Sequence, residues 1–312
     1  MADTARSVRT SHPFRAGRAA APVLVLGQIT SLQVGSAVAK GAYDHVGPTA
    51  LAGMRLTFSA MIMILLVRPR PRRIAVHQWR VAISLGLVLA AMNVAYFQAI
   101  SHLQIGVAST LELLGPLTLS IVLSHRLEHL AAALLALAGV LLLTASAPSL
   151  SLLGILLGVL AALCRAGYTV LNQRVGHLFP DWSGLTVALA VGACILAPVT
   201  AATDTNTVAA HPSVLVTGLG VALLSSLIPY ALDMTVLRRI DTRAFGVLLA
   251  LSPAVGAGVG FAVLHEHLTV RQICAIALVI AASAWSVSLD RPPRSGSSPS
   301  GTSQDTPNID HR

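Results

Sequence analysis

Long apolar stretches separated by short polar connections run through most of this chain. A helix needs about 20 mostly apolar residues to cross a bilayer, and a membrane β-barrel needs alternating apolar and polar positions instead. The pattern therefore excludes a barrel and predicts an all-α integral membrane protein with ten transmembrane helices. The predicted spans are residues 22–43, 48–67, 80–101, 104–124, 130–147, 151–173, 183–202, 213–236, 243–264 and 270–289.

Composition supports this prediction and excludes a soluble fold. Hydrophobic residues make up 54% of the chain and charged residues 11%, and the mean hydropathy is +0.75. Soluble domains carry about a quarter of their residues as charged side chains, and disordered chains are poor in apolar residues. Cys164, Cys194 and Cys274 lie inside apolar runs without metal-ligand spacing, so we expect neither a disulfide framework nor a zinc site.

The net charge of +9 and the pI of about 10.7 are explained by membrane topology. Most Lys and Arg residues fall in the first 21 residues, in the connection at 68–80 and in alternate connections after it. Positive residues collect on the cytoplasmic side of membrane proteins. We therefore expect both termini to be cytoplasmic, with residues 1–21 and a disordered stretch at 290–312 as tails. The basic side could attract anionic lipid, and no nucleic-acid partner is needed.

The two halves of the chain resemble each other. Residues 111–117 read LELLGPL and residues 248–254 read LLALSPA, and in each half a glutamate, Glu128 or Glu266, follows the proline. This pattern predicts two five-helix repeats, at 22–147 and 151–289. An odd number of spans inverts the second copy, and inverted repeats are typical of secondary transporters with a substrate site near the membrane midplane.

Polar residues recur on one face of several predicted spans. Intramembrane polar groups normally face the bundle interior or a wet cavity, because contact with lipid is costly. We therefore expect a substrate site here, and we expect prolines within the spans to act as hinges. The candidate substrate-binding residues are Gln33, Lys40, Arg55, Asn93, Tyr96, Glu112, Arg165, Tyr168, Asn172, Tyr230 and Asp233, and the candidate hinges are Pro116, Pro229 and Pro253.

Glu112 is the strongest of these candidates, because it lies near the middle of its span with leucines on both sides. Pro116 cannot donate a hydrogen bond to the Glu112 carbonyl, so a free acceptor accompanies the carboxyl group. Three other candidates have structural alternatives. Lys40 could snorkel to the outer interface, Arg55 could pair with a carboxylate or with helix carbonyls, and Asp233 could be interfacial.

Sequence signatures of catalysis are lacking. No Walker A sequence, no H-E-x-x-H and no CxxC pattern occurs, and paired Asp motifs for a metal–diphosphate are missing. His265 and His267 flank Glu266 in a connection, where two histidines are more often solvated than metal-bound. We therefore predict no cofactor, no metal and no enzyme activity.

The chain resembles the drug/metabolite transporter superfamily of the EamA type, ten-span carriers, and within it the bacterial threonine/homoserine exporters. The resemblance rests on segments in both halves, including Ser31 to Lys40, the LELLGPL segment, and Pro229 to Met234. Other matching segments are Met54-Arg55-Leu56, Met92-Asn93, Asn172-Gln173-Arg174 and Asp241 to Gly246. Two positions depart from the family's pattern. Ser252 stands where a glutamate is usual, and Arg165 stands where an aromatic residue is usual.

The resemblance implies a secondary-active exporter of small amino acids in a bacterial cytoplasmic membrane, with protons as the coupling ion. Glu112 and Asp233 would bind the ammonium group of the substrate, and Lys40, Arg165 and Arg55 its carboxylate. The first alternative is a drug or metabolite exporter with a broader pocket. A channel or a membrane-embedded enzyme fits the sequence pattern less well. The sequence leaves open whether the unit is a monomer or a homodimer.

Overall fold

The computed structural model describes residues 14–124, 131, 134–139, 142, 151–179, 181–210, 212–229, 232 and 248–289. Within these ranges all regular structure is helical. In chain order the helices are α1 (Phe14–Gly41), α2 (Pro48–Val67), η1 (Pro71–Arg73), α3 (Val76–His102), α4 (Ile105–Ser124), α6 (Leu152–Leu178), α7 (Ser183–Ala210), α8 (Ser213–Ala222), η2 (Leu223–Leu227), α11 (Ser252–Leu264) and α12 (Val270–Leu289).

The helices have the length and surface of membrane spans. Among the described residues, five apolar stretches are long enough to cross a bilayer, and they lie in α1, α2, α3, α6 and α7. Large apolar side chains such as Leu65 and Leu66 are 68% and 73% exposed on the outside of the bundle. Such a surface is stable against lipid and not against water, so the prediction of a helical membrane protein is confirmed.

Several predicted boundaries agree with the observed ones. α2 and α12 have the predicted bounds, and α4 begins at Ile105, one residue later than predicted. α1 begins at Phe14, inside the predicted N-terminal tail, and α6 and α7 extend past their predicted ends to Leu178 and Ala210. Most of the predicted span 130–147 and the whole predicted tail 290–312 lie outside the described residues.

The predicted span 243–264 is not one continuous helix. Ala250 and Leu251 form a turn, and α11 begins only at Ser252, with Pro253 in its first turn. Proline lacks an N–H and its ring clashes with the preceding turn, so it fits the start of a helix and not its interior. The N-terminus of α11 therefore lies within the span that the apolar pattern suggested.

The predicted span 213–236 also departs from a regular α-helix. After α8 the chain makes five residues of π-helix, η2, before helical geometry returns at Ile228. η2 packs closely on α1, where a side chain at Gly35 would meet the Ser225 hydroxyl. π-Helical turns are rare and are frequently found at functional sites.

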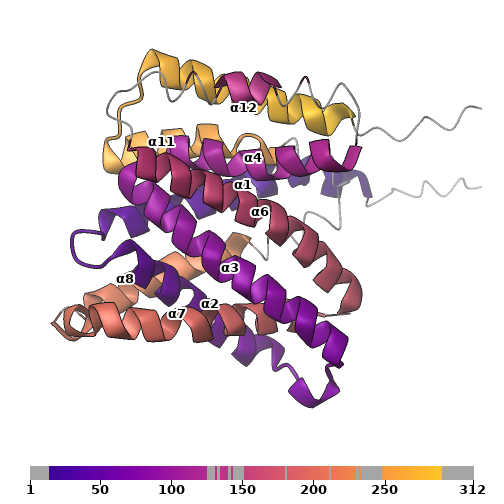
Figure 1. The fold of residues 1–312 in the computed structure, drawn as a ribbon, viewed down its shortest axis with the longest axis vertical. Helices are drawn as coiled ribbons and strands as arrows, with labels where there is room; N and C mark the ends of the chain where they lie inside the picture. Colours follow the sequence, from indigo (N-terminus) through magenta and orange to yellow (C-terminus); the bar gives the residue numbers. More distant parts are fainter. Residues whose placement is uncertain are drawn as a thin grey trace, which may run out of the picture.

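The two halves of the chain interlock. α2 packs on α7, α3 on α6 and α7, and α4 on α6 and α11. Figure 1 shows α3 and α6 running diagonally between a group of α1, α4, α11 and α12 and a group of α2, α7 and α8. Small residues allow this close packing: a Cβ on Gly86 would lie 2.6 Å from the Ala188 carbonyl oxygen, and one on Gly106 would lie 2.8 Å from Ala257 Cβ.

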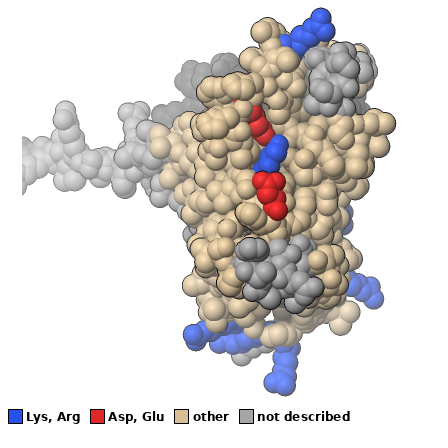
Figure 2. All heavy atoms as spheres, turned by 90° about the vertical axis from the view of Figure 1, so that its left-hand side faces the viewer, with Lys and Arg blue, Asp and Glu red and all other residues tan. Residues whose placement is uncertain are grey.

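The connections between helices fall at two ends of the bundle. The α1–α2, α3–α4 and α11–α12 connections lie together at one end, and the α2–α3 and α6–α7 connections lie at the other (Figure 1). We call these the first end and the second end. Figure 2 looks onto the first end, where one blue side chain sits between two red ones in the middle of the face, and the other blue side chains lie at its edges. Arg68, Arg70, Arg72 and Arg80 belong to the second end.

Candidate functional site

A neutral hydrogen-bond network joins four helices around Gln33. The Gln33 Nε2 atom donates to the Ser109 hydroxyl at 2.9 Å, and to the carbonyl and hydroxyl oxygens of Ser252 at 3.0 Å each. The Tyr96 hydroxyl lies 3.4 Å from Gln33 Oε1 and 3.2 Å from Ser109 Oγ. Residues from α1, α3, α4 and α11 therefore meet at the start of α11, in the interior of the bundle. We call these four residues the Gln33 network.

An ion pair between Glu112 and Arg165 lies beside this network. Arg165 Nη1 is 3.3 Å from Glu112 Oε1, and the two side chains are 27% and 17% exposed. Glu112 follows Ser109 by three residues in α4, so both side chains are on one face of that helix. Arg165 Cζ lies 5.7 Å from the centre of the Tyr168 ring, at cation–π distance. A carboxylate and a guanidinium thus lie next to a set of neutral polar groups.

Asn93 adds an unused acceptor to this region. Its Nδ2 donates to the Leu89 carbonyl of its own helix at 2.8 Å. Its Oδ1 is buried and has no hydrogen-bond partner among the described residues. Asn93 precedes Tyr96 by three residues in α3, so it shares that helix face. An unpaired buried acceptor costs free energy, and a ligand that donates a hydrogen bond would relieve that cost.

Arg55 is bound to the π-helical turn. Its Nη2 donates to the Ser225 carbonyl at 2.6 Å, its Nε donates to the Ser226 hydroxyl at 2.9 Å, and its Cζ lies 5.7 Å from the centre of the Phe97 ring. A buried guanidinium needs acceptors of this kind, because an unpaired buried charge is costly. These contacts agree with the structural alternative for Arg55, a helix-carbonyl partner, and they do not test a role with substrate.

Lys40 lies apart from these groups, at the first end of the bundle. Its Nζ is 2.6 Å from Glu266 Oε1 and donates to the Leu103 carbonyl at 2.6 Å. The other oxygen of Glu266 accepts the Ile105 backbone N–H at 3.0 Å. Lys40 follows Gln33 by seven residues, which is about 10 Å along a helix. We call this group of contacts the Lys40–Glu266 clasp, and it ties α1, the α3–α4 connection and the α11–α12 connection together.

The clasp depends on local backbone geometry after α11. His265 ends the helix in the left-handed conformation, with φ 54°, and the Glu266 N–H bonds back to the Gly260 carbonyl. This turn lays the Glu266 carboxylate over Gly260, where a Cβ would meet Oε2. The carboxylate also caps the first turn of α4, where free N–H groups favour an anion.

Comparison with known proteins identifies the family. The EamA-like transporter family matches residues 21–147 and again residues 152–288, which together cover most of the chain. The chain belongs to the EamA-like transporter family.

Two relatives of this EamA-like transporter are exporters. The threonine/homoserine exporter RhtA of Salmonella typhimurium is 34% identical over 271 residues, covering 85% of this chain and 90% of the relative. RhtA of Escherichia coli is 33% identical over 269 residues with the same coverage. A crystal structure of a protein with 20% identity aligns with a TM-score of 0.56 over 88% of this chain and 99% of the other, and this likeness concerns the fold alone.

These relationships confirm the family resemblance and the prediction of a transporter that is not an enzyme. The family match falls once in each half of the EamA-like chain, as two repeats would require. The count of ten spans and the inverted orientation of the second repeat remain predictions.

The structure describes only some of the remaining candidate residues. Tyr168 and Asn172 are half-buried on α6, on the same helix face as Arg165. α4 continues through position 116, Pro253 starts α11, and Pro229 is buried just after η2. Tyr230 and Asp233 lie outside the described residues.

Sequence reasoning missed Glu266 as a functional residue of this EamA-like transporter. It was seen only as a repeat marker between two connection histidines. The available signal was Lys40, a cation inside a span that needs a carboxylate partner, because an unpaired charge at that depth is costly.

Proposed function

We propose that this protein is a secondary-active exporter of small amino acids of the threonine or homoserine type, or of closely related metabolites. It works in a bacterial cytoplasmic membrane by alternating access, with both termini cytoplasmic and protons as the coupling ion. The observation that carries the proposal is the Glu112–Arg165 pair beside the Gln33 network. The relationship to exporters named for threonine and homoserine supports the substrate class.

The charges of an amino acid match those of the pair. The substrate ammonium would bind the Glu112 carboxylate and the unpaired Asn93 Oδ1, and the substrate carboxylate would bind Arg165. A zwitterion can replace an ion pair with two ion pairs, so neither protein charge is left buried alone. The N-terminus of α11, at Ser252, supplies a positive dipole end for the carboxylate, as broken helices do in transporters.

The substrate side chain would meet the neutral groups. Hydroxyls such as those of Tyr96 and Ser109 can donate to and accept from a substrate hydroxyl. Threonine and homoserine both carry one. An empty site keeps these groups satisfied by one another through Gln33.

Alternating access needs one end of the bundle to close while the other opens. The Lys40–Glu266 clasp closes the first end, which would be the external one, and its partners come from both halves of the chain. Pro116, Pro229 and Pro253 would serve as hinges. Proton coupling would arise if protonation of Glu112 released the substrate ammonium.

Arg165 also favours a second candidate, a metabolite with a further carboxylate. The departure from the family's usual aromatic residue adds a cation beside Tyr168. Such a protein would still be an EamA-like exporter, with a different preferred substrate.

The test is efflux of threonine and homoserine from preloaded cells that make the intact protein, Glu112→Gln or Asp181→Asn at equal membrane abundance. Asp181→Asn is the matched control, because it removes a carboxyl group in the α6–α7 connection. We expect efflux with the intact protein and the control, and none with Glu112→Gln. Equal efflux with Glu112→Gln, or none with the intact protein, would reject the assignment.

Coupling is tested in vesicles with an imposed pH gradient. Proton antiport predicts that an acidic trans compartment drives amino-acid movement and that a protonophore stops it. Movement unaffected by the gradient would reject proton coupling and leave the substrate assignment to the efflux test.

A further inference from the structure

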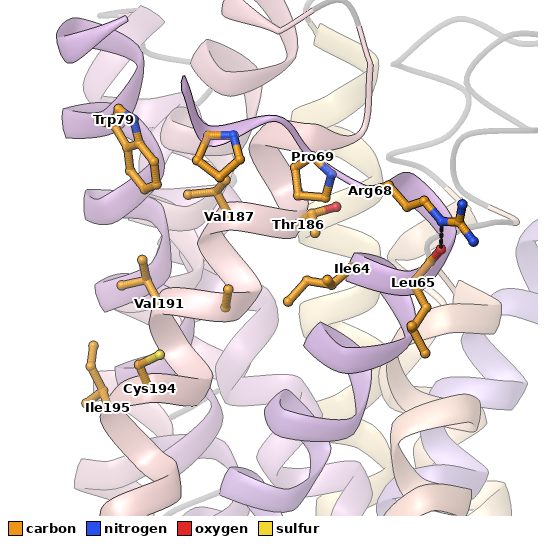
Figure 3. A pocket seen from close by; sticks show the side chains of 12 residues that line it. Ile64, Leu65, Arg68, Pro69, Trp79, Thr186, Val187, Val191, Cys194 and Ile195 are labelled. Carbon is orange, nitrogen blue, oxygen red and sulfur yellow. Dashed lines mark hydrogen bonds between the residues drawn. The ribbon is translucent and has the colours of Figure 1, made fainter. Parts of the chain in front are cut away.

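An open apolar groove lies on the outside of the bundle between α2, α3 and α7, near the second end. The cavity has a volume of about 730 Å³. Ile64 and Leu65 of α2 form one wall, and Val187, Val191 and Ile195 of α7 form the other. Figure 3 shows Trp79, Val191, Cys194 and Ile195 following one another down one side, with Ile64, Leu65 and Arg68 across from them.

The groove exists because α2 and α7 approach closely in only part of their length. Just beyond the groove lining, a Cβ on Gly53 would lie 3.3 Å from the Leu196 carbonyl oxygen of α7. No such small-residue contact joins Ile64 to α7 among the described residues, and the larger side chains hold the helices apart. The result is a wedge that opens toward the α2–α3 connection.

The dimensions of the groove match one leaflet of a membrane. Its lining on α7 runs from Thr186 to Ile195, which is about 13 Å along a helix. The hydrocarbon core of a bilayer is about 30 Å thick, so half of it is about 15 Å. Leu65 and Ile64 are 68% and 42% exposed in the groove wall. An occupant at this depth must be apolar and must enter from the leaflet at the second end.

The mouth of the groove is cationic. Arg68 caps α2 in the left-handed conformation, with φ 48°, and its Nε lies 3.4 Å from the Leu65 carbonyl. Glycine or asparagine is usual at such a position, because other side chains are strained there. Arg70 and Arg72 follow in the same connection, and Trp79 stands at the rim, as aromatic residues do at membrane interfaces.

From these features we infer that the groove binds an anionic glycerophospholipid. One acyl chain lies between α2 and α7, and the phosphate lies at the guanidinium of Arg68, which bonds phosphate oxygens in a fork. A second copy of this chain fits less well. Twofold pairing across the groove brings two basic α2–α3 connections together, and like charges repel.

The experiment compares lipid binding by the purified full-length protein in detergent. The probes are phosphatidylglycerol and phosphatidylcholine with the same acyl chains, and bound lipid is counted by native mass spectrometry. We expect phosphatidylglycerol to bind about tenfold tighter, because phosphatidylcholine carries the same phosphate but adds a quaternary ammonium that the arginines at the mouth repel. Equal binding of the two lipids would overturn the inference.

Two variants separate the headgroup from the acyl chain. Arg68→Asn removes the cation but keeps a residue that accepts the left-handed conformation, so the lipid-free protein should be at least as heat-stable as the parent and lose the preference for phosphatidylglycerol. Ala190→Phe fills the groove and should weaken both lipids alike. Arg70→Asn is the matched control, since it removes an arginine that does not line the groove, and it should retain the preference.

Three other results would each reject the lipid site. The first is loss of preference in Arg70→Asn equal to that in Arg68→Asn, which indicates diffuse attraction by the whole connection. The second is displacement of the lipid by glycerol phosphate alone, which indicates a headgroup site without the groove. The third is a change of oligomeric state in Ala190→Phe with lipid binding unaltered, which indicates an interface between copies.

Discussion

The Lys40–Glu266 and Glu112–Arg165 ion pairs each join the first half of the chain to the second, yet the protein holds them differently. Lys40 and Glu266 are 2.6 Å apart, and each also binds a backbone group, Lys40 the Leu103 carbonyl and Glu266 the Ile105 N–H at the start of α4. Glu112 and Arg165 are 3.3 Å apart and meet between two helices, beside the Gln33 network. We expect the shorter pair, which backbone groups also hold, to be harder for a ligand to replace than the longer pair.

This difference assigns the two pairs to separate tasks. The clasp fastens the first end of the bundle, where three connections meet (Figure 1). The inner pair offers opposite charges to a zwitterion. Both pairs follow from one property of membrane interiors, where each charge needs a partner.

Breaking the clasp should have the largest effect on stability. Lys40→Met leaves Glu266 without its cation, and we expect the free energy of unfolding to fall by about 2–4 kcal/mol. This is below the value for a fully buried pair, because the side chains are 21% and 11% exposed. Chemical unfolding in detergent measures it, with Arg271→Met as the matched removal of an exposed cation at the same end.

The double variant Lys40→Met with Glu266→Gln shows whether the two residues act together. We expect a coupling of about 1–3 kcal/mol, so that the double variant is more stable than the sum of the single losses predicts. Additive losses would mean that the clasp is not a unit.

Gly260→Ala should weaken the clasp without changing any charge. The new Cβ meets the Glu266 carboxylate, and overpacking of this kind costs about 1–3 kcal/mol. Gly258→Ala in the same helix has open space at its Cβ and should be neutral or stabilising by up to about 1 kcal/mol. Thermal unfolding of the two variants side by side gives the answer, and an equal response of both would argue against close packing of Glu266 on α11.

Arg165→Gln should affect transport more than stability. Loss of the cation removes the proposed partner of the substrate carboxylate, and we expect efflux to fall about tenfold, equivalent to about 1.4 kcal/mol. The free energy of unfolding should fall by less than in Lys40→Met, because the 3.3 Å contact of this pair is longer than the 2.6 Å contact of the clasp. Arg165→Lys keeps the charge and should retain part of the efflux. A stability loss as large as that of Lys40→Met would remove the distinction between the two pairs.

Ser252→Glu should give the smallest effect. It restores the carboxylate usual in the family, at a helix N-terminus that stabilises an anion by about 0.3–1 kcal/mol. The new charge lies at Gln33, and we expect the ratio of threonine to homoserine efflux to change about two- to fivefold, which is below about 1 kcal/mol. Ser252→Gln supplies the size without the charge, and an equal change in that variant would assign the effect to volume.

Much of the helical framework could be predicted from the apolar pattern. The bounds of α2 and α12 agree with the prediction, because long apolar runs end at Pro, Gly or Arg residues that mark helix boundaries. The break before α11 and the π-turn η2 were not predicted, because the residues there are as apolar as those of a continuous span. Proline at 253 was recognised as a hinge candidate, but not as the start of a helix.

The sequence was sufficient to select the polar candidate residues, but it did not show which residue each of them contacts. Gln33, Tyr96 and Glu112 were selected because polar residues in a span must face protein or a cavity. That Arg165 faces Glu112, while Lys40 faces Glu266, depends on helix rotation and on the left-handed turn at His265. Sequence spacing within one helix carries no information about another helix.

The sequence by itself determined the membrane class, the helical composition, the family and the inventory of charged residues inside the bundle. Local hydrophobicity and residue spacing are sufficient for these, because the bilayer admits few kinds of structure. Only the tertiary structure decided which charge meets which, where α11 begins, and where α2 and α7 separate to leave a groove. Those outcomes arise from packing between segments that are far apart in the chain. A small rotation or shift of one helix there changes the contact partners of its side chains.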